Sequence, residues 1–108
     1  MYSSVCIDEL KKELKDNEKI STCARECNIF GDITTLKICY VLRHYPKMSV
    51  SDIAIIVESS ISNVSHMLSK LKKMDIVSYK KVSKQNLYSI KDKKFAKFID
   101  FLFLDYEK

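Results

Sequence analysis

Hydrophobic residues recur at intervals of three and four along most of the chain, and this spacing predicts a mainly helical protein. Near the start, for example, Ile7, Leu10 and Leu14 fall on one helix face with charged residues between them. The pattern predicts five or six helices, over residues 5–19, 22–30, 33–45, 53–57, 61–73 and 93–106. A single glycine and a single proline among 108 residues argue against a turn-rich all-β fold.

Two of these helices are short, adjacent and separated by a polar break. Residues 49–52 (SVSD) have the spacing of a capping box before the first, and Ser60 is placed to cap the second. The second helix has Val64, Leu68 and Leu71 on one face and small polar or basic residues on the other. This arrangement predicts a helix-turn-helix over residues 49–73.

A β-hairpin is predicted directly after the helix-turn-helix. Asp75 stands where a chain leaving a helix often adopts a left-handed conformation, which aspartate tolerates. Residues 76–82 and 87–90 have the composition of strands, and residues 83–86 form the turn between them. The predicted fold is therefore a winged helix-turn-helix, a mainly α domain over residues 1–108 with a two-stranded β-wing at residues 76–90.

The last predicted helix is too apolar to be a surface helix of a monomer. Its hydrophobic residues cover nearly every side. They are Phe95, Phe98, Ile99, Phe101, Leu102, Phe103, Leu104 and Tyr106. A partner subunit that covers this helix is the economical explanation.

The positive charge of the chain is concentrated in the second half of the helix-turn-helix and the wing. Residues 70–84 hold six lysines and one acid, which equals the net charge of +5 of the whole chain. The other residues carry 13 basic and 13 acidic side chains. A basic window on an otherwise neutral protein is typical of a phosphate-backbone partner, although a lysine-rich solvated face is the alternative.

The outer face of the second helix and the wing together suit double-stranded DNA. Short side chains let a helix enter the major groove, and Asn63 can pair with the edge of an adenine. Lysines at the end of the helix and on the wing can neutralise phosphates. The candidate DNA-binding residues are Ser60, Ser62, Asn63, Ser65, His66, Lys70, Lys72, Lys73, Lys80, Lys81 and Lys84.

At these residues the chain resembles the ArsR/SmtB family of small winged-helix repressors. The resemblance rests on residues 51–54 (SDIA), 60–68 (SISNVSHML), 75–77 (DIV) and 87–90 (LYSI), and it covers roughly residues 20–106. It implies a homodimer that binds operator DNA and is paired through its first and last helices, here residues 5–19 and 93–106. It also implies release by metal or metalloid ions, or by thiol oxidation.

The best-known sensor sites of that family are missing from this chain. Metalloid sensors often carry Cys-x-Cys-Asp where this chain has SVSD at residues 49–52, without a thiol. The zinc site of the last helix needs pairs of aspartate and histidine. Asp92 is present, but Lys94 and the apolar residues after it supply no histidine.

Four cysteines are the remaining candidates for a sensor. Cys23 and Cys27 lie four residues apart on one predicted helix, which places both thiols on one face. Such a pair can hold a soft ion such as arsenite, cadmium, zinc or copper(I), or it can oxidise. Cys6 is the candidate third ligand, whereas Cys39 is expected to pack in the core. The alternative for the pair is simple packing, which is common for free cysteine.

Catalysis finds no support in the sequence, which lacks a glycine-rich phosphate loop and any recognisable nucleophile–base set. No apolar stretch is long enough to span a membrane, and residues 1–15 lack the layout of a signal peptide, so we expect a cytoplasmic protein. The sequence predicts a DNA-binding transcriptional regulator, expected to be a repressor released by a thiol-directed effector. The alternatives are a winged-helix protein–protein adaptor that binds no DNA, and a DNA-binding repressor without an effector.

Overall fold

The computed structural model describes residues 6–104, with Phe30 described by its backbone alone, and divides the chain into two compact units. The first unit, Met1–Gly31, contains helices α1 (Ile7–Asp16) and α2 (Glu18–Phe30). Asn17 separates them because its extended backbone ends α1 and its side chain accepts a hydrogen bond from the Lys19 amide at 2.9 Å. The second predicted helix therefore begins four residues earlier than expected, while Val5 lies outside the described residues.

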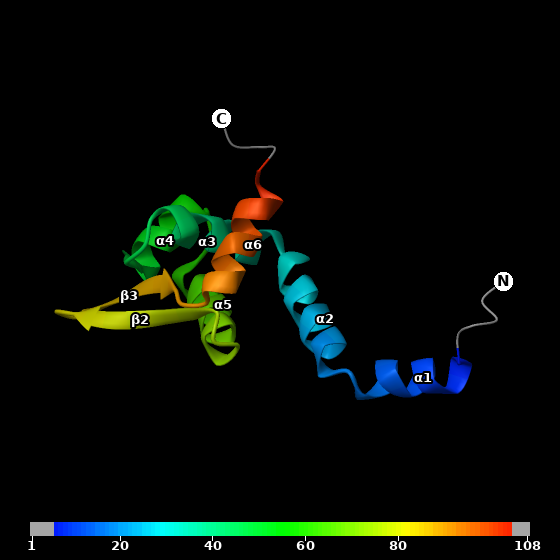
Figure 1. The fold of residues 1–108 in the computed structure, drawn as a ribbon. Helices are drawn as coiled ribbons and strands as arrows, with labels where there is room; N and C mark the ends of the chain where they lie inside the picture. The colour runs from blue at the N-terminus through cyan, green and yellow to red at the C-terminus, as the bar shows by residue number, and fades with distance from the viewer. Residues whose placement is uncertain (1–5, 105–108) are drawn as a thin grey trace. The chain divides into compact units, whose positions relative to one another are not determined.

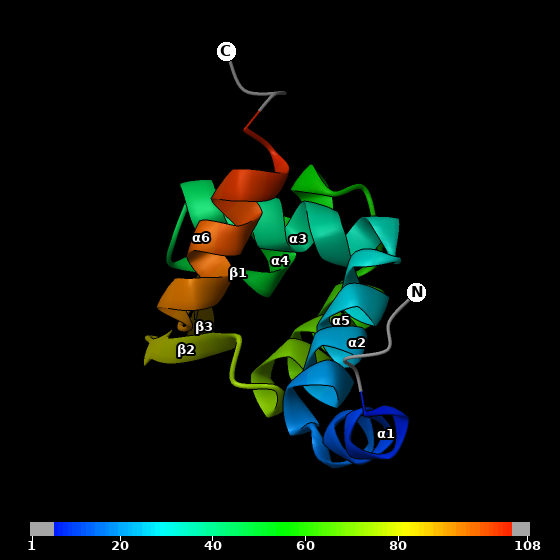
Figure 2. The same ribbon diagram turned by 45° about the vertical axis from the view of Figure 1, so that its right-hand side comes forward.

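The second unit, Asp32–Lys108, contains the winged-helix fold (Figure 1). Its elements are α3 (Ile33–His44), β1 (Met48–Ser49), α4 (Val50–Ile56), α5 (Ile61–Lys73), β2 (Val77–Val82), β3 (Gln85–Ile90) and α6 (Lys93–Leu102). Figure 2 shows α6 lying beside α3, with the β2–β3 hairpin near the start of α6. The predicted fold class, a mainly α winged helix-turn-helix, is confirmed.

The helix starts follow the predicted capping residues. Asp32, Ser49 and Ser60 each accept a hydrogen bond from the backbone amide three residues ahead, at 3.1, 3.2 and 3.0 Å. Asp92 accepts from the amides of Lys94 and Phe95 at 2.9 and 3.3 Å. These side chains satisfy amides that the helix itself leaves unpaired, so the sequence fixes where each helix begins.

The wing has one strand more than predicted. β2 and β3 pair antiparallel with Val82 opposite Gln85, which leaves a two-residue turn of Ser83 and Lys84. The short strand β1 pairs with the other edge of β3, giving the order β1-β3-β2. Because β1 has only two residues, it is too short to show an alternation of apolar and polar positions, and it was not predicted from sequence.

The core of the second unit is formed by apolar side chains of α3, α4, α5 and α6. Ile38, Leu42, Ile53, Val64, Leu68, Leu71 and Ile99 are all buried with an exposed fraction of 1% or less. Phe95 and Ile99 hold α6 against this core, whereas Phe98 and Phe101 are 37% and 71% exposed. α6 ends at Leu102, earlier than the predicted residue 106, and Tyr106 lies outside the described residues. No helix among residues 6–104 is long and apolar enough to cross a membrane.

Candidate nucleic-acid interface

The turn between α4 and α5 is built by the backbone. Glu58 adopts a left-handed conformation, with φ of 56°. Its amide donates to the Ile55 carbonyl at 3.3 Å, and the Ser59 amide donates to the Ala54 carbonyl at 3.0 Å. This pair of bonds is a Schellman motif, which ends α4 within one residue and brings Ser60 into position to cap α5.

The end of α5 repeats this construction at Asp75, whose φ is 60°. The Asp75 amide donates to the Lys72 carbonyl and the Ile76 amide to the Leu71 carbonyl, each at 3.0 Å. The left-handed residue predicted after Met74 is therefore present. Asp75 turns the chain directly from α5, the second or recognition helix of the helix-turn-helix, into the first strand of the wing.

The polar side of α5 is exposed along its whole length. At 100° per residue, Ser62, His66, Ser69 and Lys73 form one outward row, opposite the buried Val64, Leu68 and Leu71. Each candidate DNA-binding residue of the sequence analysis is exposed, the lysines on β2 and its turn included. The structure thus brings all eleven to the surface of one compact unit.

Asn63, the candidate for base readout, is held at the start of the recognition helix. Its side-chain amide donates to the Ser59 hydroxyl at 2.9 Å, while its backbone amide donates to the Ser60 hydroxyl at 3.0 Å. Base-contacting residues of helix-turn-helix proteins lie at this end of the recognition helix. The contact with Ser59 limits the rotamers of Asn63, so its carboxamide is presented in a defined direction.

An aromatic pair joins the wing to the recognition helix. The Lys72 ammonium lies over the Tyr79 ring, 4.3 Å from its centroid, and the Tyr79 and Tyr88 rings are 5.3 Å apart. Tyr79 and Tyr88 face each other across β2 and β3, and burial raises the pKa of Tyr88. Tyr88 lies within the 87–90 motif of the family resemblance, whereas no sequence motif pointed to Tyr79. Lys72 therefore has a structural contact besides the phosphate contact expected for it.

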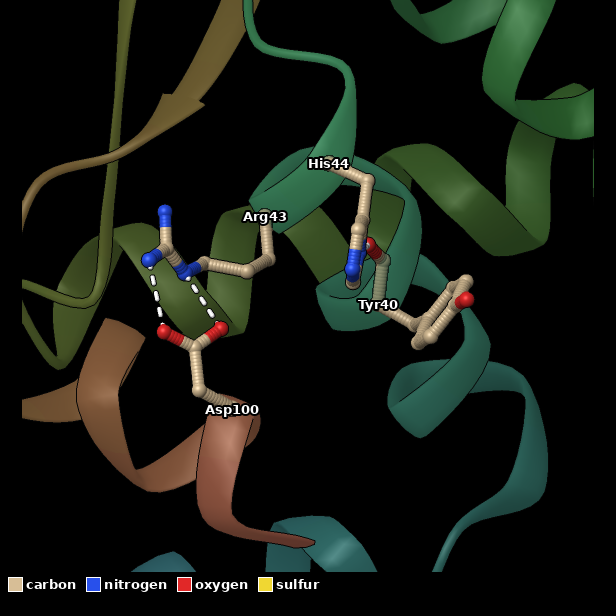
Figure 3. A network of polar contacts seen from close by, with 4 residues as sticks. All are labelled: Tyr40, Arg43, His44 and Asp100. Atoms are coloured by element: carbon tan, nitrogen blue, oxygen red, sulfur yellow. Dashed lines mark hydrogen bonds and ion pairs between the residues drawn. The ribbon is translucent and has the colours of Figure 1, made fainter. Parts of the chain in front are cut away.

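A second polar connection joins α3 to α6 (Figure 3). The Arg43 guanidinium donates two hydrogen bonds to the Asp100 carboxylate, at 2.8 and 2.6 Å. These bonds hold the pKa of Asp100 below its ordinary value. On the next face of α3, His44 stacks on Tyr40 with 4.3 Å between ring centroids, and Tyr40 meets Phe103 edge to face at 4.8 Å. The end of α6 is therefore fixed on α3 by both polar and aromatic contacts.

The four cysteines divide into one buried and three exposed thiols. Cys39 is fully buried and burial raises its pKa to about 12, as expected for a packing residue. Cys23 and Cys27 lie four residues apart on one face of α2, and the neighbouring Cys23 thiol raises the pKa of Cys27. Among residues 6–104 no group of three metal-ligating side chains is assembled, so Cys6 does not join the pair within one chain.

Comparison with known proteins places these elements in a family. Residues 32–79, from the cap of α3 to Tyr79 on the wing, match the model of bacterial regulatory proteins of the arsR family. A cadmium resistance transcriptional regulatory protein CadC homolog of Staphylococcus aureus is 33% identical over 98 residues, which are 91% of this chain and 80% of that protein. The chain belongs to the ArsR family of bacterial regulatory proteins. It is accordingly a DNA-binding transcriptional regulator, as the sequence resemblance predicted.

Solved structures agree with the ArsR assignment at the level of the fold. NolR from Sinorhizobium fredii has a TM-score of 0.73 and 26% identity, covering 82% of this chain and 88% of that one. The homodimeric winged helix-turn-helix domain of Mb0332 from Mycobacterium bovis has a TM-score of 0.72 and 18% identity, covering 82% and 81%. The ArsR model ends within β2, so the hairpin turn and α6 rest on these wider similarities and on the geometry above.

Proposed function

We propose that this ArsR-family protein is a homodimeric repressor that binds operator DNA through α5 and the β2–β3 wing. The observation that carries the proposal is that all eleven candidate polar and basic residues from Ser60 to Lys84 are exposed, while the apolar Val64, Leu68 and Leu71 between them are buried. Short side chains at the start of α5 suit the major groove, and the lysines at its end and on the wing suit phosphates. A homodimer would present two such surfaces to successive major grooves of a near-palindromic operator.

Two features of the chain support pairing with a second copy. α1 has no buried residue, although Ile7, Leu10 and Leu14 form an apolar face that is 70%, 44% and 55% exposed. On α6, Phe101 is 71% exposed. A monomer would keep these faces in water at a cost of roughly 25 cal/mol per Å² of apolar surface. The related Mb0332 domain is homodimeric.

The experiment that tests DNA readout compares the Asn63→Ala variant with the unchanged protein. Fluorescence anisotropy measures the affinity for a duplex from the region upstream of the protein's own gene and for a random duplex. The ratio of these two affinities is the specificity ratio. Loss of a bidentate base contact should lower the free energy of discrimination between the two duplexes by about 1–3 kcal/mol. Asn28→Ala on α2 is the matched control, because Asn28 is an exposed asparagine outside the proposed surface. An unchanged ratio for Asn63→Ala removes Asn63 from readout. No binding to either duplex would favour the protein–protein adaptor instead.

We further propose that the effector acts on the thiols of Cys23 and Cys27. The pair is exposed and adjacent, and the S. aureus relative is named for cadmium resistance. Two thiolates suit a soft ion or a disulfide, but a closed site for a soft ion needs a further ligand. Since residues 6–104 of one chain assemble no third ligand, that ligand would come from the second copy or from solution.

The effector proposal is tested by titrating the protein–DNA complex with cadmium and, separately, with the thiol oxidant diamide. Release that disappears in Cys23→Ser and Cys27→Ser, and persists in Cys6→Ser, supports a sensor made of the α2 pair. If release from DNA is also lost in Cys6→Ser, the Cys6 thiol is part of the sensor site. A complex that neither reagent disturbs identifies a repressor that does not respond to thiol chemistry.

A further inference from the structure

A cavity of about 680 Å³ lies within the winged-helix unit, between α3, β1, the end of α4 and the residue after α6. Its volume falls in the range of small-molecule sites in proteins, about 300–1,000 Å³. None of its lining residues belongs to the proposed DNA surface. DNA contacts therefore do not explain the cavity.

The walls of this cavity are apolar and partly aromatic. Val41 and Val57 line it from the core and are 8% and 5% exposed, while Tyr40 and Phe103 supply aromatic walls. At its rim, Ile33 is 70% exposed, so a large aliphatic side chain stands in water beside the opening. Such walls favour a ligand with an apolar body.

One charged side chain lines the cavity, the exposed Lys37 on α3. No carboxylate is among the lining residues. An ammonium at the edge of an otherwise apolar cavity selects a ligand with one anionic group, since a cationic group would be repelled and an uncharged one would gain no ion pair. The complementary molecule is an amphipathic carboxylate, with the carboxylate at Lys37 and the apolar body between the aromatic walls.

The cavity also adjoins the helix-turn-helix. Ile56 and Val57 line it, and they are the last residue of α4 and its C-cap. The next residues are Glu58 and Ser59 of the Schellman turn that leads into α5. A ligand that packs on Ile56 and Val57 contacts the element that sets the position of the recognition helix. A ligand that binds the DNA-bound and DNA-free forms of the protein unequally would change the affinity for DNA.

We propose that this cavity binds a small amphipathic carboxylate, such as a medium-chain fatty acid, and that occupancy changes the affinity for DNA. The binding step stands on the cavity alone, whereas the change in DNA affinity rests on the proposed function.

Isothermal titration calorimetry of the full-length protein with decanoate, without DNA, tests the binding step. Decan-1-ol and decyltrimethylammonium have the same apolar body without the anionic group, and both should bind more weakly than decanoate. Lys37→Glu should weaken the affinity for decanoate by about tenfold. Lys97→Glu, an exposed lysine of α6 outside the cavity, should leave the affinity unchanged.

Two adjacent isoleucines give a matched control for the apolar wall. Ile56 lines the cavity and is 53% exposed, whereas Ile55 is 75% exposed and does not line it. Both variants are expected to fold, since neither side chain is in the core. Ile56→Glu should abolish decanoate binding and Ile55→Glu should not.

The outcomes separate the cavity from the DNA proposal. Decanoate binding with the expected variant pattern supports the site even if the protein binds no DNA, and DNA binding without decanoate binding overturns the site alone. Equal affinity for decanoate and decyltrimethylammonium overturns the anionic specificity. The cavity could instead be occupied by a second copy of the chain, which sedimentation analysis tests by measuring the oligomeric state. If Ile56→Glu dissociates an oligomer and decanoate does not bind, the cavity is a contact between copies and the proposal is wrong.

Discussion

Arg43 and Asp100 join α3 and α6 by two parallel hydrogen bonds, Nε to one carboxylate oxygen at 2.8 Å and a terminal guanidinium nitrogen to the other at 2.6 Å. The side chains are 38% and 46% exposed, so water screens the pair but does not separate it. The bidentate geometry fixes the orientation of α6 as well as its distance from α3. Since α6 carries the exposed Phe98 and Phe101, this ion pair sets the direction in which the proposed dimer surface faces.

Asp100→Asn should lower the stability of the protein at neutral pH and leave it unchanged at low pH. The pKa of Asp100 is lowered in the folded state, so its contribution is present above the ordinary carboxyl pKa and is lost as pH falls through the lowered value. Thermal unfolding of both proteins from pH 2 to 7 measures this. Asp16→Asn, at an exposed aspartate of α1, is the control. A constant difference in melting temperature across the range would contradict the prediction.

Asp75→Gly should stabilise the protein by about 0.5–1 kcal/mol, because glycine adopts the left-handed conformation without a Cβ penalty. The Lys91–Asp75 pair that it removes is 3.4 Å long and exposed, and exposed pairs contribute little. Urea unfolding gives the free energy. Ser69→Gly, in the regular part of α5, should instead destabilise by about 0.5 kcal/mol, because glycine has a lower helix propensity than serine. A loss of stability in Asp75→Gly would mean that the carboxylate matters more than the backbone.

Replacing Lys80 and Lys81 together by alanine should weaken binding to all DNA sequences and flatten its salt dependence. Each lost phosphate contact lowers the slope of log K against log salt by about 0.9. Anisotropy between 50 and 200 mM salt, roughly the range over which such contacts are resolved, gives the slope. Lys93→Ala with Lys94→Ala on α6 is the matched control for a loss of two charges. Equal slopes for the wing variant and the native protein would place the wing away from the phosphates.

Tyr79→Ala should loosen the wing from the recognition helix, whereas Tyr79→Phe should behave like the native protein. The phenylalanine keeps the ring beneath the Lys72 ammonium and beside Tyr88, and the alanine removes both contacts. Contacts of these kinds contribute about 0.5–1.5 kcal/mol each. Unfolding free energies and DNA affinity should fall together in the alanine variant. If the phenylalanine variant fails equally, the hydroxyl rather than the ring is important.

Native alkylation should distinguish Cys39 from the other thiols. Cys39 is fully buried with a pKa of about 12, so at pH 8 its thiolate is both rare and inaccessible. Iodoacetamide followed by peptide mass spectrometry should label Cys6, Cys23 and Cys27 in the folded protein and Cys39 only in denaturant. The raised pKa of Cys27 predicts that its labelling accelerates in Cys23→Ala, which removes the neighbouring thiol. Native labelling of Cys39 would mean that the core opens readily.

Local sequence chemistry predicted the helix-turn-helix almost completely. Ser49, Ser60 and Asp92 cap the helices that they were expected to cap, and α5 has the predicted bounds of residues 61–73. Asp75 has the left-handed conformation expected after α5. Each of these features depends on neighbours within a few residues, so the chain specifies it without reference to the rest of the fold.

Features that depend on tertiary contacts were not predictable. β1 is too short to alternate and exists because β3 lies beside it. The Arg43–Asp100 pair spans 57 residues, a separation at which sequence pattern carries no signal. The Tyr79–Tyr88 pair would follow from the hairpin register, but the predicted turn of residues 83–86 was two residues too long to give it. Gly31 ends α2 as expected, yet its φ of −72° shows that no left-handed conformation requires glycine there.

The N-terminal helices contain no fully buried side chain among Cys6 to Ile29. Isolated helices of 10 and 13 residues, the lengths of α1 and α2, are marginal in water because nucleation is costly. Their amides should therefore exchange with deuterium rapidly in dilute protein and slow as the concentration rises, while the amides of α3 and α5 exchange slowly throughout. Amide exchange in the N-terminal helices would then measure assembly of the proposed dimer, whereas amide exchange in the winged-helix unit would measure folding of the chain.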